Sequence, residues 1–257
     1  MDVKQYFERI HYHGAPRPDL ATLHALQCAH MHALPFENLS IHYGQPIILD
    51  ENLLFRKLIQ NRRGGFCYEL NGLFAALLRA LGFDVSLVAA EVAGADGAFG
   101  PAFDHMALLV QLDETYLVDV GFGDSFQAPL RLAVRAEQDQ GEAAYRIDVE
   151  GAYHILSRTP QRGTRGEPAS AMRTQYRFTP APRALADFKQ MCDYHQSSPA
   201  SHFTQKRICS RATALGRVSI SDMRLIITRK GVREESALAS ETQFLRALDE
   251  HCGIRLE

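Results

Sequence analysis

The sequence predicts an α+β protein in which helices, antiparallel strands and a mixed segment follow one another. Apolar residues recur at three- and four-residue steps through residues 1–82, which is the pattern of helices with one buried face. From residue 83 the pattern changes to alternation and short apolar runs, which are typical of strands. A Pro-Ala-Pro segment at 180–182 marks a second boundary. We therefore expect three parts, covering residues 1–82, 83–182 and 183–257.

In the first part, residues that cap helices stand in front of apolar stripes. Asp19 and Asp50 are expected N-caps because an aspartate side chain accepts hydrogen bonds from free backbone N–H groups. A third stripe begins behind Gly64 and Gly65 and is closed by Gly82. The residues expected to face inward are Leu20, Leu23, Leu26, Met31, Leu53, Leu54, Leu58 and Ile59 in the first two stripes, and Leu70, Leu73, Phe74, Leu77, Leu78 and Leu81 in the third.

The second part carries several short strand patterns, two of which form a hairpin over residues 105–123. Consecutive antiparallel strands of this kind predict a sheet or a small barrel. The expected strands cover residues 85–88, 105–112, 116–123, 145–149, 153–156 and 175–178, and a loop covers 158–170. In the third part we expect a helix near 185–192, an irregular segment at 197–203, a strand at 223–228, and a last helix that begins at Ser240 and ends at Gly253.

Charge and hydropathy exclude several classes of protein. The chain has 257 residues and a net charge of -2, which gives no electrostatic reason to bind nucleic acid or an anionic membrane. No apolar run approaches the roughly 20 residues of a membrane span. The first residues lack the apolar core of a signal peptide. We therefore expect a cytoplasmic protein without nucleic-acid or membrane partners.

The cysteines and histidines argue against a disulfide framework and a metal site. Five cysteines are widely spaced and form no CxxC pair, which favours a reducing compartment. The pairs His11 with His13 and His30 with His32 are two residues apart, a spacing that points side chains away from each other on a helix. No metal ligand is expected.

Cys67 lies in the first turn of the third predicted helix. Free backbone N–H groups and the helix dipole favour an anion there, so a thiolate becomes more accessible near neutral pH. A cysteine within an apolar helix is more often a small buried hydrophobe. Two later residues favour the catalytic interpretation.

Those residues are His105 and Asp119, one on each strand of the predicted hairpin. Asp119 lies between Val118 and Val120, and a buried carboxylate without a partner costs several kcal/mol, by order of magnitude. A cysteine at a helix start, a histidine and a carboxylate are the parts of a thiol-nucleophile triad. In this hypothesis Cys67 is the nucleophile, His105 its base and Asp119 the group that orients the imidazole.

The triad sets a condition on the turn of the hairpin. A two-residue turn would place His105 and Asp119 on opposite faces of the sheet, whereas an odd-length turn or a bulge places them on the same face. With a five-residue loop at 111–115, the two residues lie diagonally across the strands, with about 7–8 Å between their backbone positions. We therefore predict that the turn is not a two-residue turn.

Four segments resemble the motifs of the arylamine N-acetyltransferase family. The most specific is the segment around the cysteine, and the resemblance spans about residues 5–205, which is most of the chain. The segments are 63–71 (RGGFCYELN), 35–39 (PFENL), His105 with 118–123 (VDVGFG), and 198–203 (SPASHF).

The resemblance implies an N-terminal helical bundle that carries the nucleophile, a central antiparallel β-barrel that carries the histidine and aspartate, and a C-terminal α/β lid. The Cys-His-Asp core would be like that of cysteine proteases and transglutaminases. The implied reaction is a ping-pong transfer in which acetyl-CoA acetylates Cys67 and an aromatic amine, hydroxylamine or hydrazine accepts the acetyl group. No cofactor would be bound permanently, and the protein would be a monomer or a weak homo-oligomer.

The resemblance also implies contacts with both substrates. Phe122, Gly123 and Ser125 would lie beside the pantetheine arm of acetyl-CoA, although a plain turn fits the same residues. Phe36, Val92 and Phe122 are candidates for the wall that holds the aromatic substrate, and each is as readily explained as core.

Three charged residues near the motifs carry two separate hypotheses. Glu37 and Arg63 could form a buried pair that braces the Cys67 loop. Asp104 precedes His105, at a position where a neutral or basic residue is expected. A carboxylate there could raise the pKa of His105 or repel the phosphates of CoA.

Three other functions are compatible with parts of this pattern. An amide synthase that closes a macrolactam from a carrier-bound acyl chain would share the triad with a different donor. A thiol hydrolase would use the same residues and let water reach the thioester. A binding module with a relict triad is disfavoured because Cys67, His105 and Asp119 are all present.

Overall fold

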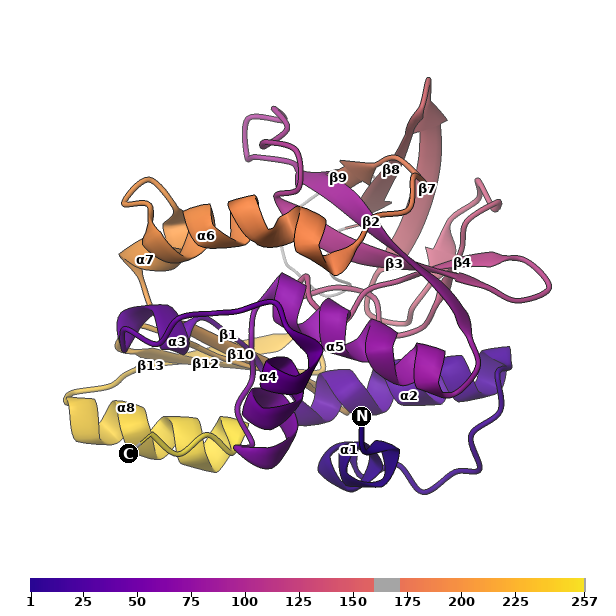
Figure 1. Ribbon diagram of the computed structural model, residues 1–257. Helices are drawn as coiled ribbons and strands as arrows, with labels where there is room; N and C mark the ends of the chain where they lie inside the picture. Colours follow the sequence, from indigo (N-terminus) through magenta and orange to yellow (C-terminus); the bar gives the residue numbers. More distant parts are fainter. Residues whose placement is uncertain (160–171, 257) are drawn as a thin grey trace.

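The computed structural model describes residues 1–159 and 172–256, in which two antiparallel sheets lie on either side of a helical layer (Figure 1). In that part of the chain, no helix is both long and apolar enough to cross a membrane. The helical segments are α1 (Val3–Ile10), α2 (Leu20–Ala33), α3 (Leu39–His42), α4 (Glu51–Phe55), η1 (Arg56–Gln60), α5 (Cys67–Ala80), η2 (Leu185–Phe188), α6 (Lys189–Ser197), α7 (His202–Gln205), α8 (Glu241–Ala247) and η3 (Leu248–Cys252).

The larger sheet has eight strands in the order β5-β4-β3-β2-β9-β8-β7-β6 and is a nearly closed barrel. Its two edges approach each other at Gln138, whose side chain accepts from the backbone N–H of Arg131 and donates to the Arg131 carbonyl. The strands are β2 (Asp84–Val92), β3 (His105–Gln111), β4 (Thr115–Val118), β5 (Leu130–Arg131), β6 (Gln138–Asp139), β7 (Ala144–Glu150), β8 (Tyr153–Arg158) and β9 (Arg173–Phe178).

The smaller sheet has five strands in the order β1-β10-β11-β12-β13. The last helical segments, α8 and η3, cover one of its faces through a core that includes Phe244 and Leu248 (Figure 1). One edge strand of this sheet, β13, is exposed along its length and rich in charged residues, which hinders pairing of this edge with another chain. The strands are β1 (Phe36–Glu37), β10 (Ile208–Thr213), β11 (Gly216–Ser221), β12 (Arg224–Arg229) and β13 (Val232–Ala237).

Helix α5 crosses the centre of the molecule, with β2 and β3 on one side and α1 and α4 on the other (Figure 1). Every side chain from Cys67 to Leu78 is buried, so the helix has no solvent-facing side before its last turn. Strands β2 to β4 bury one face in the barrel and the other against α5, which explains their nearly continuous apolar runs. The first residue of α5 therefore lies deep in the protein.

Most helix boundaries agree with those expected from the sequence. Asp19 accepts from the backbone N–H of Thr22, and Asp50 accepts from two N–H groups of α4. Gly82 and Gly253 have positive φ angles of 87° and 67° at helix ends, where glycine avoids strain. The expected inward positions of Leu20 and Leu53 are wrong: these side chains, in the first turns of α2 and α4, are 41% and 38% exposed.

The hairpin has the odd-length turn that the triad requires. Gln111 pairs with Thr115 and Leu108 with Val118, so His105 and Asp119 lie on the same face, diagonal to each other. The expected strand over 116–123 is too long, because β4 stops at Val118 and Asp119 follows it. The carboxylate is thus at a strand end, where its neighbours' N–H groups are free to bind it.

Several elements were not expected from the sequence. Strand β1 lies in the part of the chain expected to be helical. It has only two residues and is a strand because it pairs with the distant strand β10. Strands β10, β11 and β13 were also missed, since polar residues interrupt their apolar positions. The expected irregular segment at 197–203 runs into the short helix α7. Most of the loop expected at 158–170 lies outside the described residues, while Arg158 ends β8.

Candidate active site

Cys67 is the first residue of α5 and is only 3% exposed. The helix start is capped by Glu69, whose Oε2 accepts from the backbone N–H of Phe66 at 3.2 Å. Gly121 packs directly against this turn: a Cβ atom on it would lie 2.8 Å from Cys67 Cα. The loop after β4 can therefore approach the cysteine only because it has glycine there.

Asp119 binds His105 in a buried contact of 2.7 Å between Oδ2 and the imidazole Nε2. Neither side chain is more than 3% exposed. Since Asp119 contacts Nε2, Nδ1 is the ring nitrogen that remains for another partner. This confirms the predicted contact between the two hairpin residues.

Two residues that the sequence analysis gave no role complete the surroundings of Asp119. Asn71 donates from Nδ2 to Asp119 Oδ1 at 2.9 Å and to the Met106 carbonyl at 2.7 Å. Its Oδ1 accepts from the backbone N–H of Val120. The Tyr176 hydroxyl donates to Asp119 Oδ2 at 3.1 Å. The sequence indicated Asn71 only as a member of the motif around the cysteine, and Tyr176 only as a residue of an expected strand.

The electrostatics of Asp119 favour the ionised form. Burial opposes ionisation, but the neighbouring His105, Asn71 and the backbone N–H of Gly121 together lower the pKa of this carboxyl below its ordinary value. A carboxylate held in its ionised form at this point fixes the orientation of the imidazole.

The expected effect of the helix start on Cys67 is outweighed by burial. Burial raises the pKa of the Cys67 thiol, and Asp119, Cys192 and Asp104 raise it further, while a backbone hydrogen bond from Met106 lowers it. The helix dipole alone therefore does not produce a thiolate in the resting protein. Ionisation of the thiol requires a base beside it.

The loop after Asp119 carries the three residues expected to contact the acyl donor, and it places Phe122 beside His105. The Phe122 ring lies 5.1 Å from the His105 ring and 5.1 Å from the Tyr176 ring. Gly123 has a φ angle of 89° and open space where a side chain would be. The Ser125 hydroxyl is buried and has no hydrogen-bond partner among residues 1–159 and 172–256.

The other two expected substrate residues come from different elements. Phe36 is half-buried in β1, where it bridges Gly65 just before the cysteine turn, and its ring lies 6.1 Å from that of Phe203. Val92 is half-buried at the end of β2 and pairs with Tyr176. Phe36 thus lies beside the turn that precedes Cys67. Val92 lies beside Tyr176, whose hydroxyl donates to Asp119.

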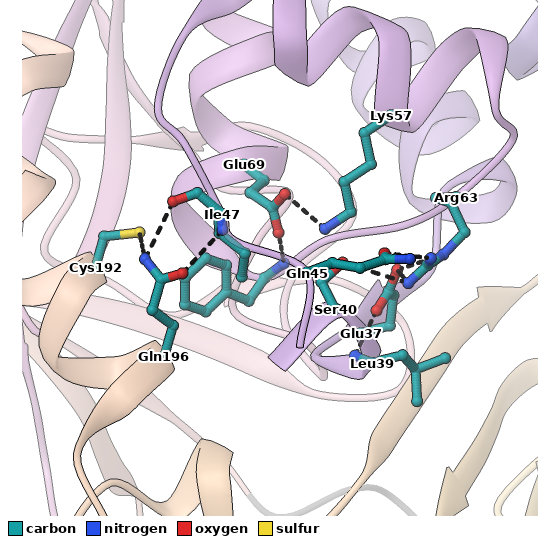
Figure 2. Close-up of polar contacts among 11 residues, drawn as sticks. Glu37, Leu39, Ser40, Gln45, Ile47, Lys57, Arg63, Glu69, Cys192 and Gln196 are labelled. Carbon is teal, nitrogen blue, oxygen red and sulfur yellow. Dashed lines mark hydrogen bonds and ion pairs between the residues drawn. The ribbon is translucent and has the colours of Figure 1, made fainter. Parts of the chain in front are cut away.

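Two ion pairs, one of them fully buried, lie next to the turn that precedes Cys67 (Figure 2). Arg63 donates two hydrogen bonds to Glu37 Oε1, at 2.8 and 3.1 Å, and Glu37 Oε2 accepts from the Leu39 N–H. Lys57 pairs with Glu69 at 2.7 Å. The predicted pair between Glu37 and Arg63 is thereby confirmed, whereas its bracing role stays a prediction.

Gly64 and Gly65 are required by this packing. A Cβ on Gly64 would lie 2.1 Å from the Pro35 carbonyl oxygen, and one on Gly65 would lie 2.8 Å from Glu69 Oε2. The two glycines thus let the chain pass between Pro35 and Glu69. Within the described residues, no group of three histidine, cysteine or acidic side chains is arranged to hold a metal ion.

The geometry defines a thiol enzyme: a cysteine at a buried helix start faces a strand pair that presents a histidine held by an aspartate. The profile of the N-acetyltransferase family matches residues 19–257. An arylamine N-acetyltransferase of Mycolicibacterium smegmatis is 37% identical over 263 residues, which cover 100% of this chain and 93% of the relative. The chain therefore belongs to the arylamine N-acetyltransferases, a family of acetyl-CoA-dependent acyltransferases.

Solved structures agree with this assignment. Arylamine N-acetyltransferase from Salmonella typhimurium has a TM-score of 0.90 at 30% identity, covering 98% of this chain and 90% of that one. The Mycobacterium marinum enzyme in complex with CoA has a TM-score of 0.89 at 32% identity, covering 98% and 93%. The α+β fold and the family expected from the sequence are confirmed.

Proposed function

We propose that this chain transfers the acetyl group of acetyl-CoA to the nitrogen of aromatic amines, hydroxylamines or hydrazines through a thioester on Cys67. The observation that supports this most is the His105–Asp119 contact next to the helix start that carries Cys67. The carboxylate is held by four groups, so its position and charge are fixed before any substrate binds.

In the first half-reaction, His105 Nδ1 takes the proton of the Cys67 thiol and the thiolate attacks the carbonyl carbon of acetyl-CoA. The bond from that carbon to the CoA sulfur breaks, and CoA leaves as a thiol with the proton returned by the imidazolium. One thioester replaces another, so the step is close to balanced in energy. Because burial raises the pKa of the thiol, the thiolate exists only as a pair with protonated His105.

In the second half-reaction, the amine attacks the acetyl carbon and Cys67 leaves as the thiolate. His105 accepts the proton that the nitrogen loses, and it returns that proton to the sulfur. Weakly basic aromatic amines keep their lone pair free at neutral pH, which suits them as acceptors. Asp119 stays ionised throughout and keeps Nε2 of His105 as the donor in their contact.

The residues around the triad have proposed roles that follow from their places. Phe122, Gly123 and Ser125 would line the path of the pantetheine arm, and Phe36, Val92 and Phe122 would contact the aromatic ring of the acceptor. We also propose a three-part division at residues 82 and 182, with the last part covering the site. A cytoplasmic enzyme of xenobiotic metabolism, monomeric or weakly self-associating, fits these proposals.

The alternatives receive less support. A macrolactam-forming amide synthase would need a donor site for a carrier-bound acyl chain, and a thiol hydrolase would need water at the thioester. Family membership over nearly the whole chain favours acetyl-CoA and an arylamine instead.

The proposal is tested by mixing the protein with acetyl-CoA, first without and then with an aromatic hydrazine, and following CoA release and intact mass. The expected result is a stoichiometric burst of CoA, a gain of one acetyl group, and turnover only with the hydrazine. Cys67→Ala should show none of these. Absence of acetylation would favour the amide synthase, and steady CoA release without an acceptor would favour the hydrolase.

A further inference from the structure

A second histidine–aspartate pair lies directly beside the proposed triad. His195 of α6 places Nε2 3.1 Å from Oδ1 of Asp104, the residue that precedes His105. The histidine side chain is 3% exposed and the aspartate 15%. Among the described residues Nε2 has no hydrogen-bond partner, and its contact with Asp104 is an ion pair when the imidazole is protonated.

The ring of His195 is held firmly in this position. Its Nδ1 lies 3.1 Å from the Ser201 hydroxyl at the start of α7. Its faces and edges contact two rings of the Cys67 neighbourhood: Tyr68 stacks at 6.1 Å and Phe203 packs edge-on at 5.1 Å. A cation on His195 would thus be localised next to Asp104.

The backbone that His195 reaches is constrained from the other side as well. Phe103 has a φ angle of 66°, a conformation that a phenylalanine adopts only when its surroundings compensate for the strain. The hydroxyl of Tyr68, the residue after Cys67, donates to the carbonyls of Phe103 and Asp104 at 2.7 and 3.2 Å. The segment that leads into His105 is therefore fixed by Tyr68 on one side and by His195 on the other.

The charge of Asp104 reaches the nucleophile. After burial, Asp119 and Cys192, Asp104 is a further group that raises the pKa of the Cys67 thiol. A cation paired with Asp104 offsets that effect. Two other basic side chains lie nearby: His202, whose ring lies 6.1 Å from that of His195, and Lys206. Burial, followed by His195 and Lys206, lowers the pKa of His202, which favours its neutral form.

We propose that His195 is a positioning residue for this reaction: it anchors Asp104, and through it the backbone of His105, and supplies the counter-charge that shields Cys67 from the Asp104 carboxylate. This inference rests on the proposed role of Cys67 and His105. It also explains how the chain tolerates an acidic residue before its catalytic histidine. Asp104 is neutralised from the third part of the chain rather than by a residue of its own strand.

The test is a double-mutant cycle of His195→Gln and Asp104→Asn, read as the pH profile of Cys67 alkylation by iodoacetamide. Cys67→Ala provides the background from the other cysteines. Glutamine keeps hydrogen-bonding capacity but has no charge, so His195→Gln should move the rising limb of the profile to higher pH by about half a unit, about threefold in rate at neutral pH. Asp104→Asn should move it the opposite way, and the double variant should return to the wild-type profile or below it.

Alkylation does not depend on acetyl-CoA, so failure of the proposed acetyl transfer is distinguished from failure of this inference. The rate of acetylation by acetyl-CoA is measured in parallel and should follow the same order. His154→Gln is the matched control, because His154 stacks on Phe178 in the barrel and should leave the profile unchanged.

Two results would overturn the inference. One is a double variant as slow as His195→Gln alone, which would mean that His195 acts only by packing. The other is an unchanged profile in Asp104→Asn, a variant that can be judged even if His195→Gln does not fold.

Discussion

Asp119 illustrates at the residue scale how a buried charge is stabilised here. Its side chain is completely buried, yet Asn71, Gly121, His105 and Tyr176 each bind one of its two oxygens. A carboxylate in an apolar environment costs several kcal/mol unless such partners compensate for lost water. The partners come from α5, β3, β9 and the loop after β4, so the whole site must be assembled to hold the charge.

Tyr176→Phe tests the contribution of one partner. Removing the hydroxyl leaves Asp119 Oδ2 with His105 alone, so the imidazole is oriented less firmly and Asp119 is easier to protonate. We expect the rate of Cys67 acetylation to fall about tenfold, the equivalent of one hydrogen bond to a charged group. Tyr116→Phe is the control, because that hydroxyl bonds Glu114 near the surface.

The measurement is single-turnover acetylation together with thermal unfolding. Equal losses of rate in both tyrosine variants, or a rate for Tyr176→Phe that equals wild type, would contradict a specific role for this hydroxyl.

At the scale of elements, the start of α5 depends on a strand of only two residues. Strand β1 places Glu37 against Arg63, so the turn before Cys67 is held to the five-stranded sheet by a buried ion pair (Figure 2). Such a pair adds little net stability over apolar packing, but loss of one partner leaves an uncompensated buried charge. We therefore predict that the pair fixes the position of the turn more than it stabilises the fold.

Glu37→Gln is expected to lower the free energy of unfolding by about 3 kcal/mol, because the Arg63 guanidinium then lacks its carboxylate. It should also slow acetylation of Cys67, whose turn loses its anchor. Urea unfolding and single-turnover acetylation measure the two effects. The matched control is Glu235→Gln, an exposed pair with Arg224 on the edge strand, where the change should stay within about 0.5 kcal/mol. Unaltered stability and activity in Glu37→Gln would refute the bracing role.

At the scale of the whole molecule, three helices meet at His30. Its Nδ1 bonds the Tyr6 hydroxyl of α1 at 2.8 Å, and its ring lies 5.0 Å from Phe74 of α5. Burial, with a smaller contribution from Arg9, lowers the pKa of His30 to about 3. The histidine is therefore neutral in the folded protein over most of the acid range.

This burial predicts acid sensitivity of the fold. An unfolded histidine has a pKa of about 6.5, so below that pH the unfolded state binds a proton that the folded state does not. Stability that is complete above pH 6.5 is lost as the pH falls, by about 2 kcal/mol at pH 5. His30→Gln should remove that difference between pH 7 and pH 5 in urea unfolding. His24→Gln, an exposed residue of the same helix, should retain it, and equal slopes in both variants would contradict the assignment.

The organisation of the two sheets shows which elements sequence patterns predict. Strands β2 to β4 and β7 to β9 were expected because their apolar runs are bounded by turns. Strands β1, β10, β11 and β13 were missed, since a two-residue strand and polar alternation carry little local signal. The pairing of β1 depends on the distant contact between residues 36–37 and 209–210, which no local pattern contains.

The sequence by itself determined the residues that carry the chemistry and their broad setting. Cys67 at a helix start, His105 at the head of a strand and Asp119 after an apolar run follow from local pattern and spacing, and the odd turn follows from the need to place two side chains on one face. Only the tertiary structure decided the hydrogen-bond partners of these groups and the direction of their pKa shifts. Asn71 and Tyr176 reach Asp119, and His195 reaches Asp104, from separate elements, and burial outweighs the helix dipole at Cys67, because charge and solvation depend on every neighbour in space.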